Sequence, residues 1–276
     1  MVTQRRRSRN TSGSPVALVT GAAHRIGREI ALALARDGFD VAVHYAGSRA
    51  SALATVADIK KIGRRACAVE RNLAVESGLR SLLEACEGAL GEVTCLVNSA
   101  SVFEPDTALD FEATRLARHM RVNVAAPIQL ARQLHARIAE GGQGVVINLL
   151  DQKLWNPNPD FLSYTLSKSA LRTATDLLAR ALAPKLRVVG LAPGITLPAP
   201  GQSQANFDRV SRLTPLGHSS SPQDIAQAVV YLARARAVTG TTLLVDGGQH
   251  LIPTERDVMF LGEALMAAPP PSGGGG

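Results

Sequence analysis

The strongest indication of the fold is one stretch near the start of the chain, Val16-Ala17-Leu18-Val19-Thr20-Gly21-Ala22-Ala23-His24-Arg25-Ile26-Gly27. An apolar run ends in a glycine turn, and a stripe of apolar residues at helical spacing follows between Ile26 and Arg36. Gly21 and Gly27 allow a ligand to approach the backbone closely, and the amides and positive end of the helix can face a phosphate group. The stretch therefore predicts a strand, a phosphate-binding turn and a helix.

Six further short apolar runs follow, separated by longer segments of helical character. They lie at Val41 to Tyr45, Ala66 to Val69, Thr94 to Asn98, Val145 to Leu149, Arg187 to Leu191 and Thr242 to Val245. The runs are almost continuously hydrophobic, as expected for strands buried on both faces of a parallel sheet that helices cover. The alternation predicts an α/β fold, a single doubly wound Rossmann-type domain with a seven-stranded parallel sheet over residues 15–251.

The ends of the chain differ in composition from this domain. Residues 1–14 contain four arginines and little apolar content, and residues 269–276 are rich in Pro and Gly. Such segments bury too little apolar surface to offset the entropy of ordering, so we expect a disordered basic arm and a disordered tail. Between them and the domain, residues 252–268 read as a short helical extension. It would cap a pocket of its own chain or of a neighbour.

Composition excludes several classes of function. The net charge of +7 includes the four arginines of the arm, and the other basic residues are dispersed without interleaved aromatic rings, which argues against a nucleic-acid partner. No apolar run approaches the ~20 residues that cross a bilayer, and no secretory signal is recognisable. We expect a soluble, cytoplasmic protein. Three cysteines without a C-x-x-C pair and six histidines without H-E-x-x-H predict no disulfide framework and no metal.

The end of the second predicted strand indicates which dinucleotide binds. Dinucleotide-binding folds that prefer NAD place an acidic residue there for the ribose 2′-hydroxyl, but Ala46-Gly47-Ser48-Arg49 contains none. Ser48 and Arg49, with Arg25 nearby, offer a hydroxyl and two cations to a 2′-phosphate. We expect NADPH as the cofactor. The alternatives are that Arg49 is a solvated first-turn residue and that Ser48 caps the next helix.

A tyrosine and a lysine four residues apart point to proton transfer. On a helix, Tyr164 and Lys168 lie on one face, so the phenol and the ammonium can approach the same small volume. A phenol titrates near pH ~10, and we expect the neighbouring cation to favour the phenolate. This spacing alone is common on surface helices, where the tyrosine packs and the lysine is solvated.

These motifs together resemble the short-chain dehydrogenase/reductase family. The glycine turn and the Tyr164/Lys168 pair are joined by Asn98-Ser99-Ala100-Ser101 after the fourth strand, by Asn123, and by Pro193-Gly194 after the sixth strand. The resemblance implies that Asn123 anchors a proton relay and that the protein is a homotetramer with one interface on the apolar run from 166 to 183. It also implies a set of cofactor-binding residues: Gly21, Arg25, Ile26, Gly27, His44, Tyr45, Ser48, Arg49, Asn72, Leu73, Asn98, Ala100, Ser101, Tyr164, Lys168, Pro193, Gly194 and Ile195.

Within that family the chain looks most like pteridine reductases and the related dihydromonapterin reductases. T-G-A-A-x-R-I-G, the N-x-A-S-x-F pattern at 98–103, and Asp151 in place of a serine carry this likeness. The likeness implies a small pterin-like substrate that stacks on Phe103 and contacts Arg25, Ser101 and Tyr164, with Trp155 as a wall. Phe103 and Trp155 are alternatively packing residues.

The aspartate bears on the reaction. A serine donates a hydrogen bond to a carbonyl that becomes an oxyanion, whereas an ionised carboxylate only accepts. A reduced pterin presents a C=N bond, so hydride reaches carbon and a proton must reach nitrogen, for which an acid beside Tyr164 is suited. We therefore expect Asp151, Tyr164, Lys168 and Asn123 to be the catalytic set. The alternative for Asp151 is a loop cap.

Two rival functions stay open at the level of sequence. One is an NADPH-dependent reductase of a carbonyl or 3-oxoacyl substrate, in which Asp151 has no special part. The other is a protein that binds NADPH without turnover, against which the complete Tyr164/Lys168/Asn123 set argues. After Gly194 a flexible, proline-rich loop up to Pro222 is expected to act as a substrate lid.

Overall fold

The computed structural model describes residues 13–199 and 201–261. Seven strands form one sheet in the order β3-β2-β1-β4-β5-β6-β7, and every neighbouring pair is parallel. The bounds are β1 (Val16–Val19), β2 (Asp40–Tyr45), β3 (Ala66–Glu70), β4 (Val93–Asn98), β5 (Gly144–Leu149), β6 (Leu186–Pro193) and β7 (Thr242–Val245). The predicted single Rossmann-type domain with a seven-stranded parallel sheet is confirmed.

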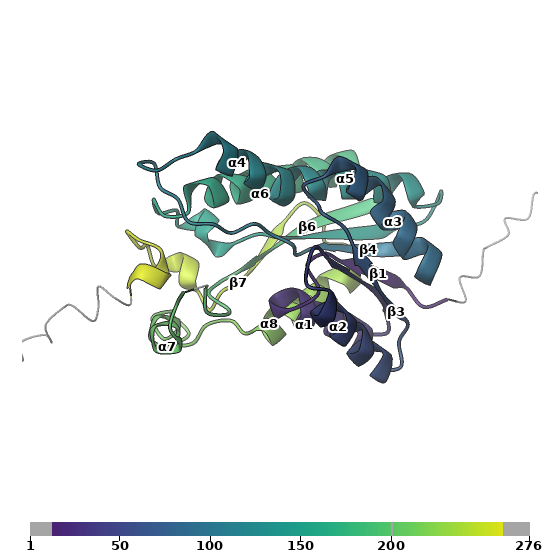
Figure 1. The fold of residues 1–276 in the computed structure, drawn as a ribbon, viewed down its shortest axis with the longest axis horizontal. Coiled ribbons are helices and arrows are strands. Elements are labelled where there is room, and N and C mark those ends of the chain that lie inside the picture. Colours follow the sequence, from purple (N-terminus) through teal and green to yellow (C-terminus); the bar gives the residue numbers. More distant parts are fainter. Residues whose placement is uncertain (1–12, 200, 262–276) are drawn as a thin grey trace, which may run out of the picture.

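Helices cover both faces of the sheet (Figure 1). On one face lie α1 (Arg25–Arg36), α2 (Arg49–Lys61) and α8 (Pro222–Arg234). On the other lie α3 (Glu76–Leu90), α4 (Ala113–Met120), α5 (Ala126–Arg137) and α6 (Leu162–Ala181), with a π-helical turn η1 (Arg121–Ala125) between α4 and α5. Two 3-10 turns, η2 (Gln152–Trp155) and η3 (Gln249–Leu251), and helix α7 (Gln204–Ser211) complete the fold.

The sheet separates two apolar cores. Strand residues that point to one face pack with α1 and α8, where Ile30 and Val229 have no exposed surface. Those that point to the other face pack with α3 and α5, where Leu82 and Leu130 are equally buried. Burial on both faces is why the strands read as continuous hydrophobic runs rather than alternating ones.

The strand order reverses between β1 and β4. The chain runs from β1 outward to β3 and then returns to the other side of β1 for β4. Loops at the carboxyl ends of these two strands diverge, and in open parallel sheets this divergence leaves a crevice for ligands. The predicted glycine turn and the Asn98 segment both lie at these ends.

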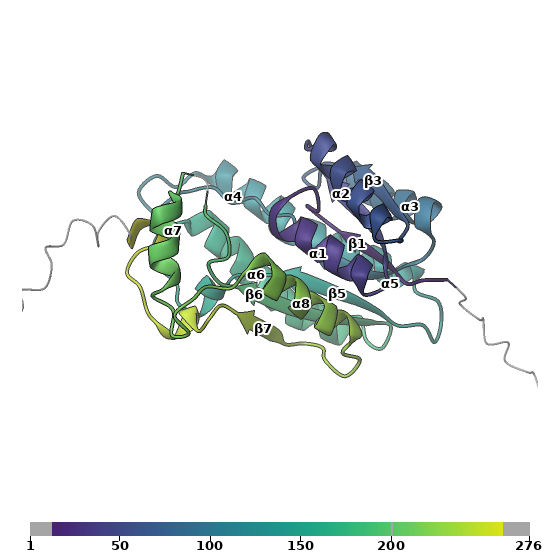
Figure 2. The same cartoon turned by 90° about the horizontal axis from the view of Figure 1, so that it is seen from below.

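The segment between β6 and α8 is more regular than expected. Instead of a wholly irregular loop it contains α7, whose N-cap Ser203 accepts a hydrogen bond from the Asn206 backbone N–H through its side chain. Figures 1 and 2 place α7 at the same end of the sheet as the last described residues. Those residues follow η3 and begin a helical turn at Val258.

Three predicted segments lie wholly or partly outside the residues that the structure describes. They are the basic arm up to residue 12, the extension beyond residue 261 and the tail from residue 269. In the part of the chain that the structure describes, no helix is both long enough and apolar enough to cross a bilayer.

Candidate active site

A pocket of about 750 Å³ opens at the carboxyl ends of the strands. Four predicted site residues do not line it: Arg49, Asn98, Asn123 and Trp155. The others do, and they come from segments far apart in sequence: Gly21, Arg25, Ile26, Gly27, His44, Tyr45, Ser48, Asn72, Leu73, Ala100, Ser101, Phe103, Asp151, Tyr164, Lys168, Pro193, Gly194 and Ile195.

The glycine turn between β1 and α1 has little room for side chains. Gly21 has a φ of +67°, which favours glycine, and a Cβ on Gly27 would lie 2.3 Å from the Gly21 carbonyl oxygen. The first turn of α1 contains no acidic residue, and no side chain caps it. The positive end of the helix therefore faces the pocket without a competing carboxylate.

His44 holds this turn in place from β2. The Gly21 backbone N–H donates to His44 Nδ1 at 3.2 Å, and His44 Nε2 lies 3.0 Å from the Arg71 carbonyl oxygen. These partners require a neutral imidazole with the proton on Nε2. Burial lowers the pKa of His44 to about 4, so the ring stays neutral near pH 7. The predicted cofactor residue His44 thus supports the turn.

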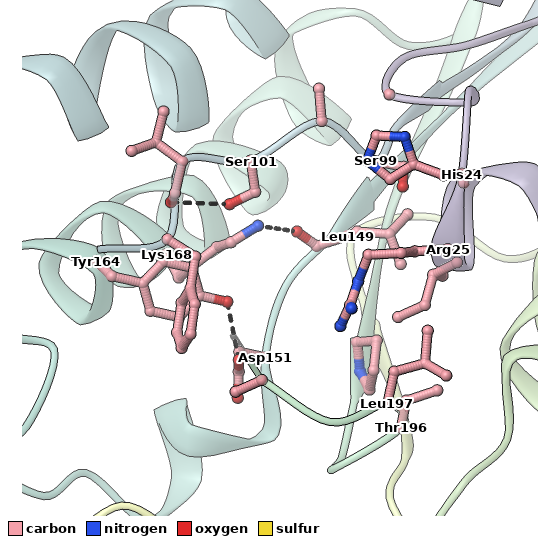
Figure 3. A pocket seen from close by; sticks show the side chains of 18 of the residues that line it. His24, Arg25, Ser99, Ser101, Leu149, Asp151, Tyr164, Lys168, Thr196 and Leu197 are labelled. Atoms are coloured by element: carbon pink, nitrogen blue, oxygen red, sulfur yellow. Dashed lines mark hydrogen bonds between the residues drawn. The ribbon is translucent and has the colours of Figure 1, made fainter. Parts of the chain in front are cut away.

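Arg25 has a left-handed backbone conformation at the start of α1. Its φ is +55°, a region that side chains other than glycine rarely adopt. Its guanidinium donates to the Pro198 carbonyl oxygen at 3.0 Å, which ties the turn to the loop after β6. Figure 3 shows the Arg25 side chain directed into the pocket. A strained, charged residue at this point fits a functional requirement.

The rim beyond β2 offers no carboxylate to a bound ligand. Ser48 lines the pocket at the N-cap position of α2, and its side chain makes no capping hydrogen bond. Arg49, the next residue, is exposed and is not part of the lining. On the same side, Asn72 Oδ1 accepts from the Ala74 backbone N–H at 2.9 Å.

Tyr164 and Asp151 are joined directly. The Tyr164 hydroxyl donates to Asp151 Oδ2 at 2.8 Å (Figure 3). The other oxygen, Asp151 Oδ1, accepts from the Lys153 backbone N–H at 2.8 Å. Lys168 Nζ donates to the Leu149 carbonyl oxygen at 2.7 Å and lies 5.7 Å from the Tyr164 ring centroid. One helix therefore brings the predicted tyrosine and lysine to the aspartate after β5.

A buried aspartate fixes the start of that helix. Asp106 Oδ1 accepts from the Ser163 backbone N–H at 3.0 Å, and its other oxygen accepts from the Ser163 hydroxyl at 2.5 Å. Phe161 precedes the first turn with a φ of +57°. The loop after β4 thus determines where Tyr164 points.

The pKa of Tyr164 corrects the prediction made from its spacing to Lys168. Burial raises this pKa well above its usual value, and the charge and hydrogen bond of Asp151 add to the increase. Burial also raises the pKa of Asp151; the hydrogen bonds from Lys153 and Tyr164 oppose this increase, and the charge of Asp257 adds to it. Burial lowers the pKa of Lys168 to about 8. Lys168 therefore does not turn the Tyr164 phenol into a phenolate here. Burial favours the protonated forms of both Tyr164 and Asp151.

Asn123 connects the pocket to the π-helical turn. Its side chain accepts from the Val102 backbone N–H at 2.8 Å and donates to Ser167 Oγ at 2.9 Å, and it also accepts from Ser101 Oγ at 3.2 Å. Pro127 has no N–H, so it cannot donate to the Asn123 carbonyl oxygen as an α-helix would require. The proton relay through Asn123 stays a proposal.

Phe103 is part of an aromatic stack. Its ring lies 4.3 Å from that of Phe161 at an interplanar angle of 15°, and 4.7 Å from Tyr164 edge-on. Phe103 is 39% exposed and lines the pocket, so it is not simply a core residue. Phe161, which sequence reasoning missed, supports it from behind.

Two predicted site residues need correction. Asn98 is buried in the sheet, where its side chain donates to Asn148 Oδ1 at 2.8 Å and links β4 to β5. Trp155 does not wall the pocket, because its ring packs on the small core beside Leu171 and under the Arg172 guanidinium at 4.3 Å. Both residues support the site from outside it.

Sequence reasoning missed several lining residues. Gln152 and Lys153 follow Asp151, and Gln152 Oε1 is a buried oxygen without a hydrogen-bond partner. Three more, at 257–259, come from the segment after η3. No motif marks these positions, and only the apolar extension predicted after residue 251 pointed towards them.

Comparisons with known proteins agree on the class of protein. A family model described as enoyl-(acyl carrier protein) reductase matches residues 21–250. FolM alternative dihydrofolate reductase 1 from Brucella canis, solved in complex with NADP, is 37% identical with a TM-score of 0.81, covering 86% of this chain and 95% of that chain.

Two sequence relatives are of different kinds. An uncharacterized oxidoreductase of Methylorubrum extorquens is 35% identical over 241 residues, which are 84% of this chain and 96% of the relative. The 3-oxoacyl-(acyl-carrier-protein) reductase FabG of Staphylococcus epidermidis is 30% identical over 240 residues, 85% of this chain and 98% of the relative.

Proposed function

Because the chain belongs to the short-chain dehydrogenase/reductase family, we propose that it is an NADPH-dependent reductase that transfers a hydride to a reduced pterin of the dihydropterin or dihydrofolate type. The Tyr164–Asp151 hydrogen bond carries this proposal. A serine at 151 would suit a developing oxyanion, whereas a carboxyl group hydrogen-bonded to the phenol can take part in delivering a proton to a ring nitrogen.

The pocket fits NADPH at the end near α1. The glycine turn leaves no space for a Cβ at Gly27, the first turn of α1 lacks acidic residues, and the rim after β2 carries Ser48 and Arg49 instead of a carboxylate. Solved relatives of this chain contain NADP, which supports the same choice. When bound, NADPH supplies the hydride.

The residues around Asp151 would deliver the proton. Burial raises the pKa values of Asp151 and Tyr164, which favours a proton on this pair beside the substrate nitrogen. Lys168, fixed by the Leu149 carbonyl oxygen, provides a cation beside the phenol and would contact the cofactor. Asn123 orders Ser101 and the backbone of Val102 at the pocket wall.

The remaining lining suits a flat, polar heterocycle. The exposed face of Phe103 gives a stacking surface, and Arg25 and Ser101 offer donors at its edge. The similarity to the Brucella canis protein named as an alternative dihydrofolate reductase supports this substrate class.

Reduction of a carbonyl or 3-oxoacyl substrate is the second candidate. The matching family model and the Staphylococcus epidermidis relative favour it by their names. A protonated Asp151 can donate to a carbonyl oxygen as well as to nitrogen. Under this candidate, Asp151→Ser would keep or increase activity.

The test is NADPH oxidation with a panel of substrates. Dihydrobiopterin, dihydromonapterin and dihydrofolate are compared with a simple diketone and an acetoacetyl thioester. We expect dihydropterin turnover that falls about 10²-fold or more in Asp151→Asn, which keeps the shape but not the acid. Asp151→Ser is the matched control for carbonyl reduction. Carbonyl turnover alone, undiminished in Asp151→Ser, would reject the pterin assignment.

A further inference from the structure

The C-terminal segment, residues 252–261, closes the substrate side of the pocket of its own chain. Asp257, Val258 and Met259 line the pocket. The Met259 carbonyl oxygen accepts from Asn206 Nδ2 of α7 at 3.2 Å, and the Phe260 ring lies 6.2 Å from that of Phe161. The segment is thus docked against α7 on one side and the aromatic stack on the other.

Two ion pairs hold this segment to the loop before α6. Arg256 Nε lies 2.8 Å from Asp160 Oδ2, and Lys153 Nζ lies 2.9 Å from Asp257 Oδ2. The Asp257 backbone N–H also donates to Asp160 Oδ2 at 2.7 Å. The side chains of Lys153 and Asp257 are 5% and 17% exposed, so solvent screens this pair less than a surface pair.

Lys153 connects Asp257 to the proposed proton donor. Its backbone N–H donates to Asp151 Oδ1, and its ammonium contacts the Asp257 carboxylate. Contacts therefore run without a gap from the Tyr164 hydroxyl through Asp151 and Lys153 to Asp257. The Asp257 carboxylate, from the C-terminal segment, is thus linked through Lys153 to the Asp151–Tyr164 pair that would transfer the proton.

We propose that Asp257 is a positioning residue for proton transfer: the C-terminal segment brings its negative charge to the pocket, where it holds a proton on the Asp151–Tyr164 pair. The inference rests on the proposed role of Asp151 as proton donor. Asp257 would act through Asp151, without itself contacting the atoms that react.

The charged groups around Asp151 and Tyr164 determine in which direction Asp257 shifts their pKa values. Tyr164 and Lys168 of α6, Lys153 of η2 and Asp257 face Asp151, while Asp257 itself faces Lys153 and the nearby Arg256–Asp160 ion pair. Burial raises the pKa of Asp151, and the hydrogen bonds from the Lys153 backbone and from Tyr164 lower it. The charge of Asp257 then raises it, and that of Lys168 lowers it. Asp257 also raises the pKa of Tyr164, after burial and Asp151.

Asp257→Asn isolates the charge. The amide oxygen of Asn can still accept from Lys153, so the segment keeps its anchor, but the ammonium loses the carboxylate that it contacts. The ionised form of Asp151 is then favoured. We expect the fall of kcat/KM with rising pH, where the pair loses its proton, to move to lower pH in this variant.

Matched variants separate charge from structure. Glu255→Gln removes the same charge from an exposed neighbour and should leave the pH profile unchanged, and Asp257→Glu should restore the wild-type profile. Thermal unfolding checks that each variant is folded. A profile that does not move in Asp257→Asn, or that moves equally in Glu255→Gln, would overturn the inference.

A second readout requires no turnover. In protein labelled with ¹³C at aspartate carboxyl groups, the Asp151 signal is assigned by its loss in Asp151→Asn and titrated in wild type and Asp257→Asn. We expect a lower midpoint in the variant. An unchanged midpoint sinks the role of Asp257, whereas a lower midpoint in a protein that reduces no dihydropterin sinks only the substrate proposal.

Discussion

His44 shows how one buried side chain makes the cofactor turn sensitive to acid. The ring accepts the Gly21 N–H only while it is neutral, and burial places its pKa at about 4 against 6.5 for an ordinary histidine. Between these values the unfolded chain binds a proton that the folded chain does not. The stabilisation is therefore complete above about pH 6.5 and is lost as the pH falls towards 4.

We predict a corresponding loss of stability in acid. The two pKa values correspond to about 3 kcal/mol in the free energy of unfolding, spread over that pH range. Urea unfolding of wild type at several pH values, compared with His44→Gln, measures it. The difference between the two proteins should shrink as the pH falls from 7 to about 4, and a constant difference would contradict the assignment.

For single residues, the sequence predicted on which face of a helix a side chain lies better than it predicted what surrounds that side chain in the folded protein. The spacing of Tyr164 and Lys168 correctly placed both side chains on one face of α6, because helical periodicity is local. The direction of the Tyr164 pKa was wrong, since it depends on burial and on Asp151, which only the folded chain brings to the phenol. Trp155 was misplaced for the same reason.

The start of α1 gives a prediction at the level of an element. Arg25 has a left-handed conformation that costs a non-glycine residue roughly 1–2 kcal/mol, and its one described hydrogen bond, to the Pro198 carbonyl oxygen, is exposed. Arg25→Gly should therefore raise the free energy of unfolding by up to about 1 kcal/mol. The same change should raise KM for the substrate, because the pocket loses a cation.

Urea unfolding and steady-state kinetics together test this prediction. Arg25→Ala is the control, because it removes the guanidinium but keeps the backbone penalty, and it should weaken substrate use without any gain in stability. A loss of stability in Arg25→Gly would mean that the contact with the loop after β6 outweighs the backbone strain.

Elements differ in how far the sequence could predict them. The seven strands were predicted because each is a short, largely apolar run between helical segments. Five of them are almost wholly buried, whereas the edge strands β3 and β7 are only partly buried. Helix α7 was missed inside a proline-rich loop, where its Ser203 cap was the only local signal. The π-helical turn at Arg121–Ala125 depends on the join of two helices at Pro127, which has no simple signature in sequence.

Assembly is a question for the whole molecule. On α6, Leu166 is 45% exposed and Leu177 is 61% exposed. They lie on the run of 166–183 that the family resemblance suggests as one interface of a homotetramer. We predict that the double change Leu166→Glu and Leu177→Glu yields a smaller species in light scattering after size exclusion. The control, Leu213→Glu, alters an exposed leucine on another surface and should leave the mass unchanged.

The position of Trp155 gives the molecule an optical signal. It is the only tryptophan in the sequence, and it lies two residues after Lys153, which lines the pocket, without lining the pocket itself. Indole emits light in the range where reduced nicotinamide absorbs, so energy transfer should quench its fluorescence when NADPH binds. A residue that takes no part in recognition would thus report occupancy of the pocket in the unmodified protein.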